Sequence, residues 1–288
     1  MVERNEQADR LLNKEFPVLD YGFVRLVDYM GSDAAIVQAA RVSYGKGTKK
    51  SSEDRALIRY LMRRRHTSPF EMAEMKFHVK LPIFVARQWI RHRTASVNEY
   101  SGRYSVMKDE FYIPRQEDIR YQSTVNKQGR ADDEVPPELS EWLLEYLTRS
   151  QTDSYDKYTE FVDSGMAREL ARIALPLSLY TEWYWKMDLH NLLHFLKLRL
   201  DSHAQLEIRE YAKVISQIVQ AAYPMTWEAF VDYSLNSICF SGPELALLRP
   251  VLKDIEINEV TASSAGLSKR EIGELAEKLR RLNSDGER

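Results

Sequence analysis

A short polar segment, residues 91–104, gathers side chains that are well suited to bind a polyanionic ligand. Its fourteen residues hold three arginines, one histidine, one glutamate, one asparagine and two serines. Arginine presents a planar, permanently charged group that holds phosphate through two hydrogen bonds. Ser101 and the backbone of Gly102 add neutral donors, and glycine lets the chain approach a ligand closely. The segment therefore indicates a site for a phosphorylated ligand.

Two features of this region leave alternatives open. Gln88 and Arg91 are spaced to share one helix face, where they serve either a nucleotide site or a solvated basic helix end. Ser101 has no base beside it in the sequence, and His66 or His92 could approach it only in space. We therefore interpret Ser101 as a hydrogen-bond donor to a ligand rather than as a nucleophile.

A second group of chemically capable residues lies about a hundred positions later. His190 and His194 have the spacing of metal-binding histidines on one helix, and His203 follows. No motif fixes a third ligand, so polar or core contacts explain these histidines equally well, and we predict no metal site. Arg199 lies among them, at the expected end of the same helix.

Composition limits the class of protein. The chain has 288 residues, and 41 basic against 43 acidic residues give a net charge of −2, which argues against a globally basic nucleic-acid binder. No apolar run approaches the length of a membrane span. The single cysteine, Cys239, excludes an intramolecular disulfide, fits the reducing cytoplasm and lies outside every motif. We expect a cytoplasmic protein that binds neither nucleic acid nor membrane.

Hydrophobic periodicity indicates the elements that position these residues. It predicts a polar, loose arm over 1–20, a main domain over 21–235 and a helical extension over 236–288. The motif itself is placed on a helix end and a loop, and further loops are expected at 45–50 and 115–135. Strands are predicted at 22–29, 75–81 and 177–186, and helices at 33–43, 51–65, 83–91, 136–164, 167–175, 188–200, 204–223, 243–252 and 268–282. The mixture predicts an α+β fold with a small sheet and many packed helices.

The polar segment also matches a longer pattern at every fixed position: Arg-His-Arg, two residues, Ser, one residue, Asn-Glu, one residue, Ser, one residue, Arg. This pattern resembles the motif of the flavin-dependent thymidylate synthases, and the resemblance extends from roughly residue 22 to residue 233. Eight specified residues at fixed spacing make it a specific signal. The positions are filled by Arg91, His92, Arg93, Ser96, Asn98, Glu99, Ser101 and Arg103.

The resemblance implies a role for each group of residues. Arg199 falls at the catalytic arginine, where a guanidinium beside the uracil ring would stabilise negative charge, and His66 and Tyr104 fall on the folate side. Some members carry Asn, Arg and Asn where this chain has Asp188, His190 and His194. Implied dUMP-binding residues are Gln88, Trp89, Ile90, Arg91, Glu99, Tyr100, Ser101, Gly102, Arg103, Arg172 and Arg199. Implied FAD-binding residues are Ser68, Arg91, His92, Arg93, Glu99, Asp188, Leu189, His190 and His194.

The implied reaction is the reductive methylation of dUMP to dTMP, with methylenetetrahydrofolate as carbon donor and NADPH-reduced FAD as hydride source. The family forms homotetramers with active sites at subunit interfaces, and we expect the same here. Two other classes stay open from the residues alone. One is a nucleotide- or RNA-binding protein that uses the arginines without chemistry, and the other is a metal-dependent hydrolase built on His190, His194 and His203.

Overall fold

The computed structural model describes residues 5–42, 51–125, 127–252 and 255–283. The chain divides into two compact units, Met1–Asn236 and Ser237–Arg288. The loop expected at 45–50 lies outside the described residues. None of the helices in the described ranges is long and apolar enough to cross a membrane.

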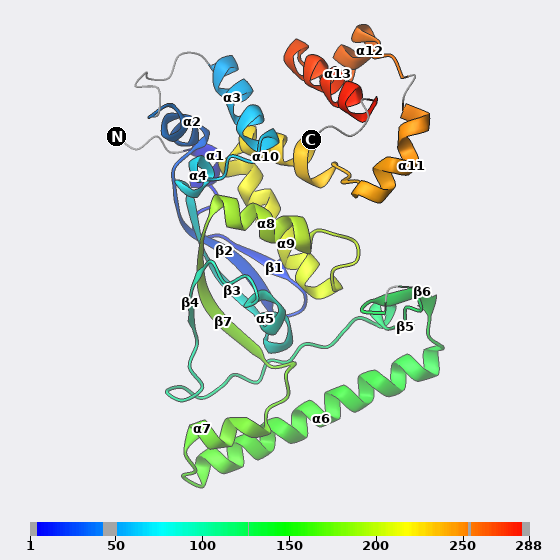
Figure 1. Ribbon diagram of the computed structural model, residues 1–288. Helices are drawn as coiled ribbons and strands as arrows, with labels where there is room; N and C mark the ends of the chain where they lie inside the picture. Colours follow the sequence, from blue (N-terminus) through cyan, green and yellow to red (C-terminus); the bar gives the residue numbers. More distant parts are fainter. Residues whose placement is uncertain (1–4, 43–50, 126, 253–254, 284–288) are drawn as a thin grey trace. The chain divides into compact units, whose positions relative to one another are not determined.

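A five-stranded antiparallel sheet forms the centre of the first unit (Figure 1). Its strands, in spatial order, are β1 (Glu15–Val18), β2 (Gly22–Met30), β3 (Glu74–Pro82), β7 (Tyr180–Asp188) and β4 (Ser96–Glu99). The two long inner strands β3 and β7 pair over their full length, from Glu74 opposite Asp188 to Pro82 opposite Tyr180. The predicted strands at 22–29, 75–81 and 177–186 are the three longest of these five, so the α+β fold with a small sheet is confirmed.

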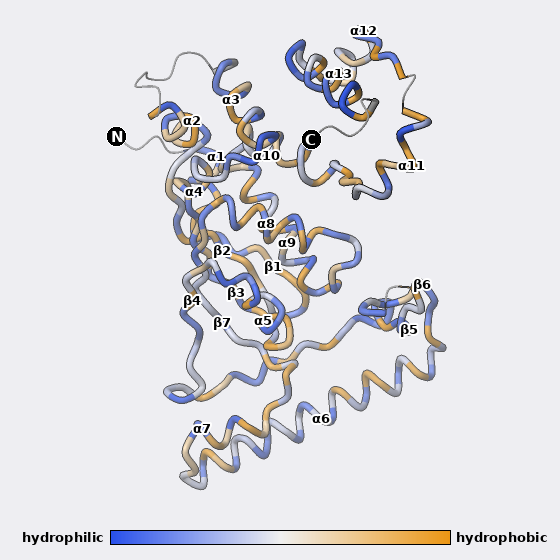
Figure 2. Tube along the Cα trace, viewed as in Figure 1, coloured by the Kyte–Doolittle hydropathy of each residue, from blue (hydrophilic) through white to orange (hydrophobic). Residues whose placement is uncertain are grey.

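Helices complete the first unit. Its long helix α6 carries hydrophilic and hydrophobic stretches in alternation along its length (Figure 2). Short 3-10 helices cover Gln116–Asp118 and Arg172–Ala174, and a π-helical turn covers Val231–Leu235. The α-helices are α1 (Glu6–Asp9), α2 (Asp33–Arg41), α3 (Ser51–Arg63), α4 (Ser68–Glu71), α5 (Ile83–Trp89), α6 (Pro137–Asp163), α7 (Arg168–Ala171), α8 (Leu189–Arg199), α9 (Leu206–Ala222) and α10 (Pro224–Phe230).

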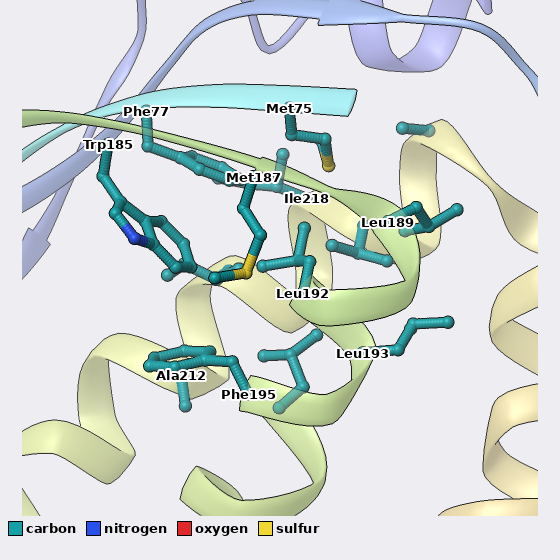
Figure 3. Close-up of a cluster of buried hydrophobic side chains, with 14 of the residues drawn as sticks. Met75, Phe77, Trp185, Met187, Leu189, Leu192, Leu193, Phe195, Ala212 and Ile218 are labelled. Carbon is teal, nitrogen blue, oxygen red and sulfur yellow. The ribbon is translucent and has the colours of Figure 1, made fainter. Parts of the chain in front are cut away.

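The core lies between the sheet and helices α8 and α9. Side chains alternate across a strand, so one face of β3 and β7 sends large apolar groups inward. Figure 3 shows Phe77, Trp185 and Met187 from these strands beside Leu192 and Phe195 of α8. Because α8 follows β7 directly and packs on this buried face, its position against the sheet is fixed. The residues at both ends of α8 are therefore held in place as well.

Three expectations about irregular segments were wrong. Residues 5–20, expected as a loose arm, contain α1 and the edge strand β1. Ser96–Glu99, expected in a loop, forms β4 by pairing with β7. The predicted loop 115–135 contains a hairpin of β5 (Arg120–Gln122) and β6 (Arg130–Glu134). Each of these strands is short and held by pairing partners rather than by its own apolar pattern.

The second unit contains α11 (Gly242–Leu252), α12 (Glu259–Ser264) and α13 (Lys269–Asn283). The helices predicted at 243–252 and 268–282 are therefore present, whereas α12 was not foreseen. Ser268 and Glu271 form a capping box at the start of α13, since the backbone N–H of each donates to the side chain of the other.

Candidate active site

The polar segment 91–104 follows α5, whose last residue, Trp89, anchors the end of the helix in the core. Trp89 is fully buried, stacked on Phe195 and edge-on to Trp183 and Trp185. The residues that follow leave the core at a fixed point and continue as β4 along β7. The segment therefore runs from the end of β7 that leads into α8 toward the end that holds Thr181.

A pocket of about 400 Å³ opens at the first of these ends. Three arginines contribute to its wall, so it carries a high positive charge suited to a phosphate-bearing ligand. It brings together residues that the sequence separates by about a hundred positions. They are Arg91, His92, Arg93, Thr94, Met187, Asn191, His194, Leu198 and Arg199.

Arg199 and His92 are in direct contact at the wall of this pocket. The guanidinium Nε of Arg199 donates to Nε2 of His92 at 3.1 Å, and the His92 ring lies edge-on to Phe195. Burial, with the charges of Arg199 and His194, lowers the pKa of His92 to about 4. Neutral His92 can accept the hydrogen bond, so it fixes Arg199 without adding a competing charge. The bond uses the Nε–H of the guanidinium and leaves its two NH2 groups available to a ligand.

The lowered pKa of His92 predicts a loss of stability in acid. Between about pH 6.5 and the folded-state pKa of about 4, the unfolded chain takes up a proton at this residue that the folded chain does not. The free energy of unfolding should therefore fall as pH drops through that window, and it should be unaffected by His92 above it. Urea unfolding at several pH values should show a shallower decline for His92→Gln than for the wild type. His203→Gln, at an exposed position, is the matched control, and equal slopes for all three proteins would contradict the prediction.

A second pocket of about 320 Å³ lies at the other end of β4. Thr181 of β7 is buried, and its hydroxyl donates to Oε1 of Glu99 at 2.8 Å, which fixes this carboxylate. The backbone N–H of Tyr100 donates to the carbonyl of Glu182 and continues the pairing with β7. The lining residues are Ile83, Glu99, Tyr100, Ser101, Gly102, Met107, Arg172, Leu175, Leu179 and Thr181.

A side chain at Gly102 would have to displace two neighbouring side chains. A Cβ at Gly102 would come 2.8 Å from Sδ of Met107 and 3.3 Å from Cδ of Arg172. The turn around it is tight, since Ser101 accepts a hydrogen bond from the N–H of Arg103 through its hydroxyl oxygen and from the N–H of Tyr104 through its carbonyl. The turn places Arg172, some seventy residues later in the chain, beside Ser101 and Gly102.

Several predicted site residues lie outside both pockets. Gln88 bonds to Gln205, Arg103 pairs with Glu169 at 3.2 Å, and Ile90 is exposed. Tyr104 is also exposed, and its carbonyl accepts from Arg168.

The remaining predicted flavin and folate positions are divided between two places. Ser68 is the first residue of α4, and the His66 ring just before it contacts Tyr60 edge-on. Asp188 caps α8 by accepting from the backbone and side chain of Asn191, and half-buried His190 lies in the first turn of that helix.

Two predicted binding residues have their side chains in the core. The side chains of Trp89 and Leu189 are both fully buried (Figure 3 shows Leu189 in the core). The backbone N–H of Leu189 is also occupied, since it donates to the carbonyl of Ala73. Helix geometry turns neighbouring residues to different faces, so these two side chains point into the core while their sequence neighbours are more exposed.

The histidine spacing has no third ligand in the described part of the chain. Nδ1 of His203 bonds to its neighbour Asp201 at 2.8 Å, whereas His194 faces His92 across 6.2 Å between ring centres. Among residues 5–42, 51–125, 127–252 and 255–283, no three His, Cys, Asp or Glu side chains are grouped to hold a metal ion.

Some pocket residues were not foreseen from the sequence. Thr181, Met187, Asn191 and Leu198 line the two pockets but belong to no motif. From the sequence, Thr181 is predicted only to be a β-branched residue of a strand. Only the pairing of β4 with β7 reveals that its hydroxyl meets Glu99.

The fold is similar to that of a solved nucleotide methylase. The solved structure of the UMP/dUMP methylase PolB from Streptomyces cacaoi bound with 5-Br UMP superposes with a TM-score of 0.68 and 36% sequence identity, covering 76% of this chain and 97% of that one. Residues 25–225 match the model of the family described as thymidylate synthase complementing protein. The chain therefore belongs to this family, that of the flavin-dependent thymidylate synthases.

Relatives of this family align with nearly the whole chain. The flavin-dependent thymidylate synthase of Wolbachia pipientis wMel is 55% identical over 270 residues, which cover 94% of each chain. The flavin-dependent thymidylate synthase of Treponema denticola is 54% identical over 269 residues, which cover 93% of this chain and 98% of that relative.

Proposed function

We propose that this chain reductively methylates dUMP to dTMP as a flavin-dependent thymidylate synthase. The observation that carries the proposal is the complete motif running along β4 between two pockets whose side chains suit two phosphorylated ligands. When bound, FAD reduced by NADPH supplies the hydride, and methylenetetrahydrofolate supplies the one-carbon unit.

The pocket at the start of α8 fits the flavin. Arg91 and Arg93 offer planar donors for its diphosphate, and His92 and His194 add polar edges. Ser68, Asp188 and His190 lie on the elements around α8 and extend this side of the site. In this assignment the residues bind and orient the cofactor, and the pocket's charge complements its phosphates.

The pocket at the other end of β4 fits the nucleotide. The Ser101–Gly102 turn provides hydroxyl and backbone donors, and Arg172 provides charge for the phosphate or the uracil carbonyls. Glu99, held by Thr181, offers a carboxylate for a sugar hydroxyl or for an arginine of another subunit. Tyr104 and His66 are assigned to the folate side.

We propose a homotetramer with shared sites, and the separation of the two pockets supports a contribution from a second copy of the chain. Arg199 lies in the flavin pocket, whereas Ser101 and Arg172 lie in the other, and the four-residue strand β4 that separates them spans ~13 Å. A guanidinium cannot polarise a uracil ring at that distance. A second copy of the chain that brings its nucleotide pocket to this Arg199 completes the site, as the family resemblance implies.

The visible absorbance spectrum tests the function first. The purified protein should show oxidised-flavin bands, and anaerobic NADPH should bleach them faster when dUMP is present. A colourless protein that FAD cannot reconstitute would favour a binding protein instead. Strong salt dependence of nucleotide binding would support that alternative, and loss of activity with a chelator would support the metal hydrolase.

Replacing the single cysteine should leave the activity intact. Cys239 is exposed and lies in the second unit, outside both pockets. The proposed mechanism needs no thiol nucleophile, so Cys239→Ser should form dTMP at a rate within about twofold of the wild type. The assay is dTMP formation under saturating substrates, and an inactive but folded, flavin-loaded variant would revive a cysteine mechanism. A cytoplasmic location is part of this proposal, supported by the single cysteine of the chain, which excludes an intramolecular disulfide.

A further inference from the structure

The end of α3 carries a basic patch that belongs to neither pocket described above. Three arginines, residues 63–65, follow one another there, and the only acid between positions 61 and 73 is Glu71. Arg63 serves the fold, because its guanidinium lies over the ring of Tyr233 and donates to its hydroxyl at 3.3 Å. Arg64 and Arg65 are exposed and line neither pocket. They therefore place positive charge at the surface that the site described above does not use.

Arg65 adopts a backbone conformation that usually belongs to glycine. Its φ is 57°, in the left-handed region, which is costly for a residue with a Cβ. This conformation closes α3, since the backbone N–H of His66 donates to the carbonyl of Leu61 at 3.0 Å and that of Arg65 to the carbonyl of Met62 at 3.1 Å. Glycine is the usual residue at this helix-ending position, because it makes the turn without strain. The chain thus has an arginine where the helix end alone favours glycine.

Attraction to the negative end of the helix explains only part of the patch. Cations near the C-terminus of a helix stabilise it. Arg63, the last residue of α3, and Arg64 provide this attraction at positions without the left-handed backbone. Residues held in costly backbone conformations cluster at functional sites. The guanidinium of Arg65 therefore indicates a ligand, and its planar donors suit a phosphate or a carboxylate.

The patch is connected to the elements that form the flavin side of the site. Arg65 precedes by three residues Ser68, the first residue of α4, and α4 packs against α8. The carbonyl of Ala73, shortly after α4, accepts from the backbone N–H of Leu189, the first residue of α8. Asn191, in the same turn of α8, lines the cationic pocket of about 400 Å³. The patch and this pocket are thus joined through α4 and the first turn of α8.

We propose that Arg64 and Arg65 bind the 2′-phosphate of NADPH and thereby select NADPH over NADH. The proposal rests on the function proposed above, in which NADPH reduces the flavin. The 2′-phosphate lies at the adenosine end of NADPH, away from the nicotinamide that gives up the hydride, so its site belongs outside the flavin pocket. Arginine is the residue that commonly accommodates this phosphate. An exposed site also suits a co-substrate that binds and leaves in every turnover.

The test compares flavin reduction by NADPH and by NADH in the FAD-loaded full-length protein, because NADH lacks only the 2′-phosphate. Arg65→Gly and Arg64→Gln each remove one guanidinium. Arg10→Gln is the matched control, since Arg10 is also an arginine at a helix end, the C-cap of α1, with its side chain 77% exposed. The KM for NADPH in anaerobic flavin bleaching should rise ~10-fold in each of the first two variants, as expected for one lost hydrogen bond between charged groups. The KM for NADH should stay within about twofold, and the control should match the wild type with both reductants.

Arg65→Gly also separates binding from a structural role. Glycine relieves the left-handed backbone, so the thermal midpoint of this variant should be at least as high as that of the wild type. Weaker NADPH binding in a variant of equal or higher stability cannot come from unfolding. Arg65→Lys keeps the charge but loses the planar fork, and it should restore part of the preference for NADPH.

Three results would each overturn the proposal. The first is a wild type with equal KM values for NADPH and NADH, and the second is a rise of both KM values by the same factor in Arg65→Gly and Arg64→Gln. The third is a raised KM for methylenetetrahydrofolate with an unchanged KM for NADPH, which would assign the patch to the carboxylates of the folate beside His66. The enzymatic function is checked separately: a wild type that forms dTMP remains a synthase whatever the variants do, and one whose flavin is not reduced and that forms no dTMP removes the function itself.

Discussion

Arg199→Ala is expected to abolish dTMP formation while leaving the flavin bound. Arg199, the last residue of α8, is half-buried in the pocket that runs along this helix, and its Nε is fixed by neutral His92. Its NH2 groups are the strongest donors available to stabilise negative charge on an activated uracil ring. Loss of a preorganised donor of this kind typically lowers kcat by about 10²–10³-fold. The flavin should stay bound because Arg91, Arg93 and His194 remain.

The measurement is single-turnover dTMP formation beside flavin content from the absorbance spectrum. Lys197→Ala is the matched control, because Lys197 lies on the same helix, is exposed and lines neither pocket. It should have normal turnover and normal flavin content. Near-normal turnover of Arg199→Ala would overturn the catalytic assignment, and loss of flavin in this variant would make Arg199 a cofactor-binding residue.

Gly22→Ala is expected to have the largest effect on stability. A Cβ at Gly22 would lie 2.1 Å from the hydroxyl of Tyr211, 2.6 Å from the carbonyl of Val18 and 2.9 Å from the carbonyl of Lys80. Two of these atoms are backbone, so the sheet must move where β1, β2 and β3 meet. The Tyr211 hydroxyl also donates to the Lys80 carbonyl at 2.7 Å, a bond that the methyl group would break. We expect a loss of about 3 kcal/mol in the free energy of unfolding.

Urea unfolding measures this loss, and two controls sharpen it. Gly22→Ala combined with Tyr211→Phe removes the shortest contact but leaves both carbonyls in place, so it should recover only part of the stability. Gly273→Ala lies inside α13, where a Cβ meets nothing within 4 Å, and helix propensity predicts a gain of up to ~1 kcal/mol for the unfolding of the second unit. Unchanged stability of Gly22→Ala would show that the three strands can shift apart without cost.

Elements with a strong apolar period could be predicted from the sequence. Strands β2, β3 and β7 alternate over eight or nine residues, and the helices that became α6, α8 and α9 repeat their apolar positions over several turns. The edge strands could not be predicted in this way. β1 is four residues long and contains Pro17, and all four residues of β4 are exposed. Such strands exist only because a longer neighbour supplies the hydrogen bonds, and the neighbour is far away in the sequence.

The candidate site likewise has a part that the sequence predicts and a part that depends on distant strand pairing. The motif predicted which side chains are chemically capable, and the structure brings Arg91, His92, Arg93, His194 and Arg199 into one pocket. The separation of this group from Ser101 and Arg172 depends on the path of β4 beside β7, which local pattern does not determine. The burial of Trp89 and Leu189 could not be predicted from the motif, because their place in a segment expected to bind ligands gave no sign that their side chains lie in the core.

The cluster around Trp89 has an optical consequence. The ring centres of Trp183 and Trp185 lie 5.7 and 5.1 Å from that of Trp89. Phe195 contacts both Trp89 and His92, which lines the cationic pocket. A flavin bound there would lie close to three rigid indoles, and its near-ultraviolet absorption overlaps indole emission. Energy transfer should therefore quench much of the chain's intrinsic fluorescence when the cofactor binds. Titration with FAD could then be followed by the emission of the protein itself, without a label and without turnover.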